Sequence, residues 1–356
     1  MAEQTLPLVR RNVLSGGFDV YGLMHDGQRF HRMPQDVADA TNPGVAGNNA
    51  HTAGGRVRFT TNSSRIEICV KMPKVTHFVH MPLTGTSGFD LYEDFEDDIG
   101  GGSRFLMVFK PEYNMTDGYT SVINLGESRE RHFTIYFPTY NGVDSLEIGL
   151  DEGATLSGGL KYLPVLPVVF YGSSITQGAC SSRPGLCYEN RISRRLNIDH
   201  VNLGFSGNAL GEQVMVDYIA GLKMSAFVLD YDHNAPNAEH LRATHRNFYE
   251  CVRAAHPDIP IILASRPDFL SLTKSGHNNV LACRSVVQDT FRAAREAGDK
   301  NVYYIDGEGF FRGVEADSCT VDGTHPNDLG FMMMADCFGR MLRRALRKGF
   351  AANEEA

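Results

Sequence analysis

The pattern of apolar and polar residues changes character near residue 165. Before that point, short runs with β-type alternation are separated by turns rich in Gly, Asn and Ser. The runs lie at residues 56–60, 65–71, 105–109, 132–137 and 146–150. Short strands at such close spacing are typical of an antiparallel β-sandwich. We therefore expect an all-β N-terminal part that no long helix interrupts.

After residue 165 the pattern becomes strand, loop, helix. Apolar runs lie at residues 167–171, 226–231, 259–264 and 302–305, and amphipathic stretches lie at 212–222, 238–255, 280–297 and 328–346. This alternation predicts a mostly parallel sheet flanked by helices. The expected domains are thus residues 1–164 and 165–350, with a flexible tail at 351–356. Ligands of such sheets bind beyond the carboxyl ends of the strands, so chemistry is expected just after each apolar run.

Length and charge narrow the classes of function. A chain of 356 residues fits two domains, and its formal charge of −8 argues against a nucleic-acid partner. No apolar stretch approaches the roughly 18–20 residues of a membrane span, so no membrane partner is expected. The first 17 residues hold no apolar segment of a secretory leader, which predicts a cytoplasmic protein unless a leader has been removed. The oligomeric state stays open.

The seven cysteines are odd in number and scattered. This fits reduced thiols better than a disulfide framework. Cys180 and Cys187 bracket a short turn, and a local bridge between them remains an alternative. No spacing of Cys or His indicates a metal site, and neither metal nor organic cofactor is expected.

The first apolar run of the C-terminal part ends at Tyr171 and opens at once into Gly-Ser-Ser-Ile-Thr-Gln-Gly at residues 172–178. A strand that runs into a Gly-flanked turn can hold a nucleophile exposed beside backbone N–H groups, and Ser174 is the candidate. The alternatives are a plain turn or a phosphate-binding loop. The second lacks the Gly-Lys-Ser/Thr that phosphate loops carry.

Three later segments supply complementary groups. Gly207 follows a second strand end at residues 201–203 and offers a backbone N–H to an oxyanion. Asn234 follows the strand after that; its amide either donates to the oxyanion or caps the next helix. Asp322 precedes His325 by three residues, so the carboxylate can orient the imidazole. The alternative is that Thr324 caps the last helix and His325 is incidental.

The order and positions of these groups resemble the SGNH/GDSL hydrolase superfamily. Its four blocks hold a Gly-Asp-Ser nucleophile turn, an oxyanion glycine, a Gly-x-Asn-Asp segment and Asp-x-x-His. The resemblance implies Ser174 as nucleophile, His325 and Asp322 as its partners, and an oxyanion hole of Ser174, Gly207 and Asn234. Two departures point to a divergent branch: Ser173 replaces the Asp of the first block, and Asp-His-Asn-Ala at 232–235 replaces Gly-x-Asn-Asp.

A narrower resemblance is to a bacterial subgroup of these hydrolases. It rests on Tyr-Gly-Ser-Ser-Ile-Thr-Gln-Gly at 171–178, Ser-Arg-Pro-Gly at 182–185 and Gly-Phe-Asp-Leu-Tyr at 88–92, which matches the subgroup's GxDLY motif. It implies a flavodoxin-like α/β SGNH hydrolase domain behind an all-β, jelly-roll-like sandwich. The same architecture occurs among carbohydrate acetyl esterases.

We therefore expect a serine esterase that hydrolyses short acyl esters, acetyl esters above all, on a small molecule or a polysaccharide. Arg183, Asp232 and His233 are expected to contact the substrate. Three alternatives stay open: a non-catalytic carbohydrate-binding protein with a silent hydrolase domain, a lipase- or thioesterase-type acyl hydrolase, and a thiol enzyme that uses Cys180.

Overall fold

The computed structural model describes residues 6–96, 102–267 and 274–346. The chain forms two compact units. Unit 1 comprises Met1–Arg32, Ala50–Lys161 and Ser182–Gly185, and unit 2 comprises Met33–Asn49, Tyr162–Ser181 and Leu186–Ala356. This division differs from the expected domains in three places, because residues 33–49 and 162–164 belong to unit 2 and residues 182–185 to unit 1. The predicted tail at 351–356 lies outside the described residues.

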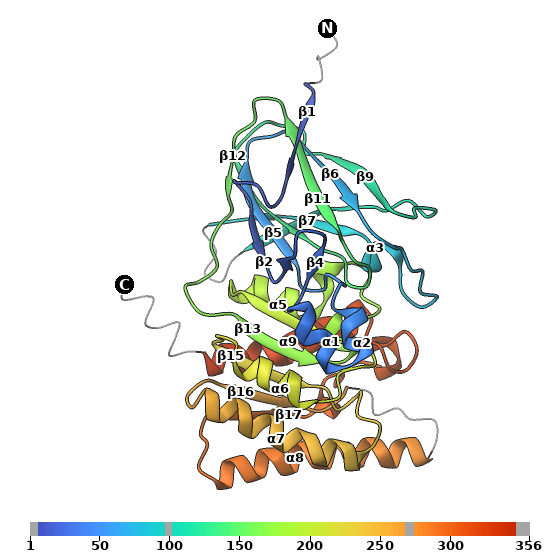
Figure 1. Cartoon of the computed structure of the whole chain (residues 1–356), viewed down its shortest axis with the longest axis vertical. Helices are drawn as coiled ribbons and strands as arrows, with labels where there is room; N and C mark the ends of the chain where they lie inside the picture. Colours follow the sequence, from blue (N-terminus) through green and yellow to red (C-terminus); the bar gives the residue numbers. More distant parts are fainter. Residues whose placement is uncertain (1–5, 97–101, 268–273, 347–356) are drawn as a thin grey trace. The chain divides into compact units, whose positions relative to one another are not determined.

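Unit 1 is built from two antiparallel sheets (Figure 1). The first has the order β1-β11-β6-β9, and the second β12-β5-β10-β7-β8 with β2 also paired to β5. The strands are β1 (Leu8–Asn12), β2 (Asp19–Tyr21), β5 (Arg56–Thr61), β6 (Arg65–Lys71), β7 (Phe89–Asp94), β8 (Ser103–Phe109), β9 (Gly118–Asn124), β10 (Arg131–Tyr136), β11 (Ser145–Asp151) and β12 (Leu156–Gly158). A hairpin of β3 (Met24–His25) and β4 (Phe30–His31) and the short helix α3 (Leu83–Thr86) complete the unit.

The core of unit 1 follows the period of two that strands impose. Ile66 and Ile68 of β6 and Phe133 and Ile135 of β10 are fully buried members of one apolar cluster. Strand β7 departs from the simple pattern because all six of its residues are buried, polar ones included. Strand β5 is likewise buried at all six positions.

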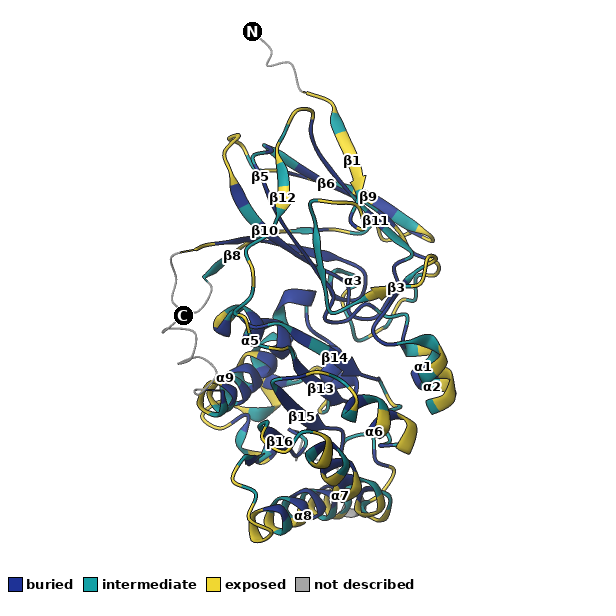
Figure 2. Cartoon of the chain, turned by 60° about the vertical axis from the view of Figure 1, so that its left-hand side comes forward, coloured by how far each residue is buried: buried dark blue, intermediate teal, exposed yellow. Residues whose placement is uncertain are grey.

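Unit 2 is a five-stranded parallel sheet with helices on both faces (Figures 1 and 2). Its strands are β13 (Val168–Gly172), β14 (His200–Gly204), β15 (Ala226–Asp230), β16 (Ile261–Ala264) and β17 (Val302–Ile305). Their order, β14-β13-β15-β16-β17, is the 2-1-3-4-5 order of flavodoxin-like folds. The predicted architecture is confirmed: a flavodoxin-like α/β domain preceded by an antiparallel β-rich domain.

Two apolar clusters hold the helices against the sheet. One face packs against α6 (Gln213–Ala220), α7 (Ala238–Ala255) and α8 (Lys274–Glu296). The other packs against α4 (Ser174–Gln177), α5 (Tyr188–Leu196) and α9 (Asp328–Ala345). Within the described residues, 3₁₀ turns occupy Pro184–Leu186, Gly307–Gly309 and Ala316–Cys319. The exposed sides of α7 and α8 face solvent, as their amphipathic sequences predicted (Figure 2).

Two short helices of the N-terminal half, α1 (Gln35–Thr41) and α2 (Pro43–Asn48), belong to unit 2. Asn42 Nδ2 donates to the carbonyl oxygen of Asn208 at 3.2 Å, and Asn48 Nδ2 donates to that of Ser206 at 3.1 Å. Two residues that lie 166 and 158 positions earlier in the chain thus support the loop after β14. Among the described helices, none has the length and apolar character needed to cross a bilayer.

Candidate active site

The turn after β13 presents Ser174 as the sequence predicted. Ser173 caps α4, its Oγ accepting the Ile175 N–H at 3.2 Å, and Gly178 ends the helix at φ +97°. Gly172 lets α4 fold back onto the sheet, since a Cβ there would lie 2.0 Å from Thr176 Oγ1. Ser174 therefore starts a one-turn helix at the carboxyl end of β13.

Ser174 and His325 meet although 151 residues separate them in the chain. Ser174 Oγ lies 2.9 Å from His325 Nε2, and His325 Nδ1 lies 2.8 Å from Asp322 Oδ2. Because a carboxylate only accepts, the ring Nδ1–H donates to Asp322, and the neutral imidazole keeps Nε2 as an acceptor for the serine proton. This is the arrangement that a general base requires.

The Asp322 carboxylate is held in place by its own loop. Its Oδ1 accepts the backbone N–H groups of His325 at 2.8 Å and Thr324 at 3.1 Å, and Gly323 turns the chain at φ +82°. Partial burial acts to raise the pKa of Asp322, but the hydrogen bonds and charge of His325 outweigh it and hold that pKa below its usual value. Asp322 is therefore ionised at neutral pH.

Both helix-capping alternatives assign the cap to the wrong residue. Asn237, not Asn234, caps α7, with its side chain accepting the His240 N–H at 2.9 Å. Asn327, not Thr324, caps α9 through the N–H groups of Leu329 and Gly330. Neither Asn234 nor Thr324 is therefore needed to start a helix.

The two predicted oxyanion donors after β14 and β15 belong to linked loops. Asn234 Oδ1 accepts the Ala209 N–H at 3.3 Å, which orients the amide. Donation from its Nδ2 to an oxyanion stays a prediction. Gly207 adopts φ +72°, and a Cβ there would meet no atom within 4 Å. The left-handed backbone conformation thus favours glycine at 207. Donation of the Gly207 N–H to an oxyanion stays a prediction.

Asp232 and His233, two of the predicted substrate contacts, are engaged with Arg266. Asp232 Oδ2 accepts the Arg266 backbone N–H at 3.1 Å, and His233 Nε2 lies 3.1 Å from Arg266 Nη2. Asp232 is almost fully buried. Contact of either residue with substrate stays a prediction. Arg266 directly follows β16, so it occupies one of the positions beyond a strand where functional residues are expected.

Arg183, the third predicted substrate contact, lies in unit 1. Its Nη1 donates to Asp90 Oδ2 at 2.8 Å and to Tyr92 Oη at 2.6 Å. Its contact with substrate also stays a prediction.

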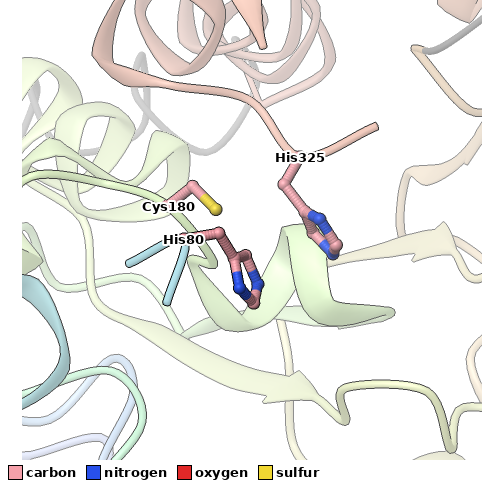
Figure 3. Close-up of side chains that lie close together, drawn as sticks. All are labelled: His80, Cys180 and His325. Carbon is pink, nitrogen blue, oxygen red and sulfur yellow. The ribbon is translucent and has the colours of Figure 1, made fainter. Parts of the chain in front are cut away.

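Cys180 lies beside the catalytic candidates but is poorly suited to act as nucleophile. Its Sγ is within 4.8 Å of a ring nitrogen of His325, and Figure 3 shows the two side chains on neighbouring loops. Burial, with the negative charge of Asp322, raises the pKa of Cys180 to about 12, so the thiol stays protonated at neutral pH. All seven cysteines are free, and the local bridge between Cys180 and Cys187 is absent.

Sequence reasoning missed two residues that support the site. Gln177 Oε1 accepts the Ser206 N–H at 3.0 Å and so joins α4 to the loop of Gly207. Asn48 supports the same loop from α2. Gln177 lies within the turn at residues 172–178 that carries the candidate nucleophile. No local signal in the sequence connects Asn48 to a loop so distant along the chain.

Comparison with known families matches both parts of the chain. Residues 166–343 match the GDSL-like lipase/acylhydrolase family. Residues 12–156 match the family described as the N-terminus of SGNH-hydrolase-type esterases, named for the GxDLY motif. No protein of curated function matches the sequence.

Solved structures share the architecture over nearly the whole chain. One described as a GDSL-like lipase from Bacteroides ovatus is 29% identical, with a TM-score of 0.85 over 96% of this chain and 98% of that one. A salicylyl-acyltransferase from a tetracycline biosynthetic pathway is 19% identical, with a TM-score of 0.76 over 96% and 97%. A family two carbohydrate esterase from Clostridium thermocellum, in complex with cellohexaose, is 16% identical, with a TM-score of 0.58 over 83% and 94%. The last two likenesses concern the fold alone.

Proposed function

Because the chain belongs to the GDSL-like lipase/acylhydrolase family, it is an ester hydrolase, and we propose that it removes short acyl groups, acetyl above all, from carbohydrate hydroxyls. The observation that carries the catalytic assignment is the hydrogen bond of 2.9 Å between Ser174 Oγ and His325 Nε2, with Asp322 on the opposite ring nitrogen. Serine, base and orienting carboxylate form the set that nucleophilic acyl transfer uses.

In the proposed reaction Ser174 Oγ attacks the ester carbonyl carbon while its proton passes to His325 Nε2. The N–H groups of Ser174 and Gly207 and the amide of Asn234 stabilise the oxyanion. As the C–O bond breaks, the imidazolium gives its proton to the leaving alcohol. Water, deprotonated by His325, then attacks the acyl-serine, releasing the acid and restoring the free serine. Ser174, His325 and the oxyanion donors supply each step.

The preference for a short acyl group on a sugar rests on two supports. The sequence holds no long apolar segment of the kind that covers lipase sites. The fold is shared with a carbohydrate esterase that binds an oligosaccharide. The second support is an analogy at the level of the fold, so the substrate class needs direct measurement.

The test is a comparison of kcat/KM for p-nitrophenyl acetate, butyrate and octanoate, followed by release of acetate from acetylated xylan and acetylated monosaccharides. The proposal predicts the highest value for acetate and release from at least one acetylated sugar. A preference for octanoate or for acyl thioesters would favour a lipase- or thioesterase-type enzyme. Sugar binding without any hydrolysis would favour the non-catalytic alternative.

A further inference from the structure

The segment Ser182–Gly185 has an unusual position. In the chain it lies between α4, which starts with the proposed nucleophile, and α5, yet it folds with the β-rich unit 1. Thr84 Oγ1 donates to the Ser182 carbonyl oxygen at 2.6 Å. The segment is thus fastened to unit 1 at its first residue, ahead of Arg183.

The strongest attachment of this segment is to the aspartate of the GxDLY motif, Asp90. Asp90, fully buried, accepts both Arg183 Nη1 and the Gly185 N–H at Oδ2, each at 2.8 Å. The Arg183 guanidinium also lies over the Phe105 ring, 3.6 Å from its centroid, and donates to Tyr92 Oη. Charge pairing of a buried carboxylate with a planar, stacked guanidinium is specific to arginine.

Gly185 completes this fit. A Cβ at 185 would lie 2.7 Å from Asp90 Oδ2 and 2.7 Å from a ring carbon of Tyr92, so no side chain has room there. The Asp and Tyr of GxDLY therefore hold one particular sequence, Arg-Pro-Gly. The motif and the Ser-Arg-Pro-Gly segment are two halves of a single attachment, which we name the latch: Asp90, Tyr92, Arg183 and Gly185.

The chain between the latch and Ser174 is short and closely hydrogen-bonded. Ser181 Oγ donates to the Gly178 carbonyl oxygen at 2.9 Å. Gly178 and Ala179 in turn donate their N–H groups to the Ser174 carbonyl oxygen, at 3.1 and 2.9 Å. Movement of residue 182 is therefore passed to the backbone of the nucleophile through bonded and hydrogen-bonded neighbours.

We propose that Asp90 and Arg183 are positioning residues for Ser174, and that the GxDLY segment acts on catalysis by anchoring the loop that follows the nucleophile. The proposal rests on the proposed esterase function. It differs from a substrate-binding role for Arg183, because a positioning residue affects every ester alike and leaves KM nearly constant. A small displacement of a reacting group lowers turnover strongly.

The test compares Asp90→Asn, Arg183→Ala and Arg183→Lys with the matched control Arg104→Ala. Arg104 pairs with Glu93 on the same strand β7, at 2.6 Å, but outside the latch. For each variant, kcat and KM are measured on p-nitrophenyl acetate and butyrate, and kcat is divided by the fraction of sites that a serine-directed phosphonate titrates. Melting temperatures are recorded in parallel, and Arg183→Ala is assayed with and without added guanidinium chloride at millimolar concentration.

For Asp90→Asn and Arg183→Ala the expected result is a fall in kcat per titrated site of about 10- to 100-fold for both esters, with KM within about twofold. The kcat of Arg183→Lys should fall less than that of Arg183→Ala, since lysine keeps the positive charge. The lysine variant also allows the test if the alanine variant does not fold. Guanidinium should restore part of the activity of Arg183→Ala alone. Arg104→Ala should keep its kcat.

Three results would overturn the proposal. A lower melting temperature with unchanged kcat per titrated site would make the latch merely structural. A raised KM with unchanged kcat would return Arg183 to substrate binding. Equal losses in Arg104→Ala would mean a general effect of removing any arginine that pairs with a carboxylate of β7. Absence of hydrolysis in the wild-type chain would instead reject the proposed function itself, which separates the two failures.

Discussion

The side chain of Asn234 offers the sharpest single prediction, because the structure separates its chemical role from a structural one. Its Oδ1 accepts the Ala209 N–H at the long distance of 3.3 Å, and α7 is capped by Asn237 instead. Asn234→Ala should therefore cost little stability, at the low end of the roughly 0.5–1.5 kcal/mol of a hydrogen bond. Loss of one oxyanion donor should reduce kcat by about 10² to 10³, equivalent to about 2.7–4 kcal/mol of transition-state stabilisation.

The assay is steady-state hydrolysis of p-nitrophenyl acetate together with thermal unfolding, applied to Asn234→Ala, Asn234→Asp and Asn237→Ala. The aspartate variant keeps the acceptor for Ala209 but places negative charge near the oxyanion, so its kcat should fall at least as far. Asn237→Ala should show the reverse pattern, with kcat kept and stability reduced by about 0.5–2 kcal/mol for a lost cap. A normal kcat with a lowered melting temperature in Asn234→Ala would refute the oxyanion role.

Three further predictions follow from neighbouring groups. Ser173→Ala removes only the cap of α4, so kcat should stay within about tenfold of wild type while stability falls by about 1 kcal/mol; a complete loss of activity would misplace the nucleophile. In Asp322→Asn the imidazolium loses its counter-charge, so the acid limb of the kcat/KM profile should move to lower pH and the plateau should drop; an unchanged profile would indicate a Ser174/His325 dyad. Burial, together with the charge of Asp230, raises the pKa of Glu189 well above its usual range, so its contribution to stability is complete below about pH 4 and is lost as pH rises. Between pH 5 and pH 9 the melting temperature of Glu189→Gln should therefore fall less than that of wild type. An equal fall in the two proteins would show that Glu189 is already ionised in the folded state.

Elements with a strong local pattern were predicted well. The amphipathic stretch at 238–255 became α7 with the same bounds, and the runs at 65–71 and 302–305 became β6 and β17. The helix has a clear period and an asparagine cap, and the two strand runs are bounded by turn residues, so the local sequence indicates their limits. The order of the site segments could also be predicted, since each candidate either follows a strand of the parallel sheet or lies just before the last helix.

Features that depend on long-range contacts were not predicted. Helices α1 and α2 have seven and six residues, too short for a reliable period, and they are held by asparagine contacts with the loop after β14. From the sequence, the two halves of the latch are separate motifs, because nothing local to Asp90 indicates a partner 93 residues away. Period and composition report on neighbours in sequence, whereas these groups find their partners only in the folded chain.

The central claim is that Ser174 is the nucleophile and His325 its base, and covalent labelling tests it most directly. The intact protein is treated with a fluorophosphonate, and the modified peptide and the rate of labelling are determined by mass spectrometry for wild type, Ser174→Ala, His325→Ala and Cys180→Ala. The account predicts one label on Ser174, none in Ser174→Ala, much slower labelling in His325→Ala, and unchanged labelling in Cys180→Ala. Labelling at another residue, or ester hydrolysis that survives in Ser174→Ala, would contradict it.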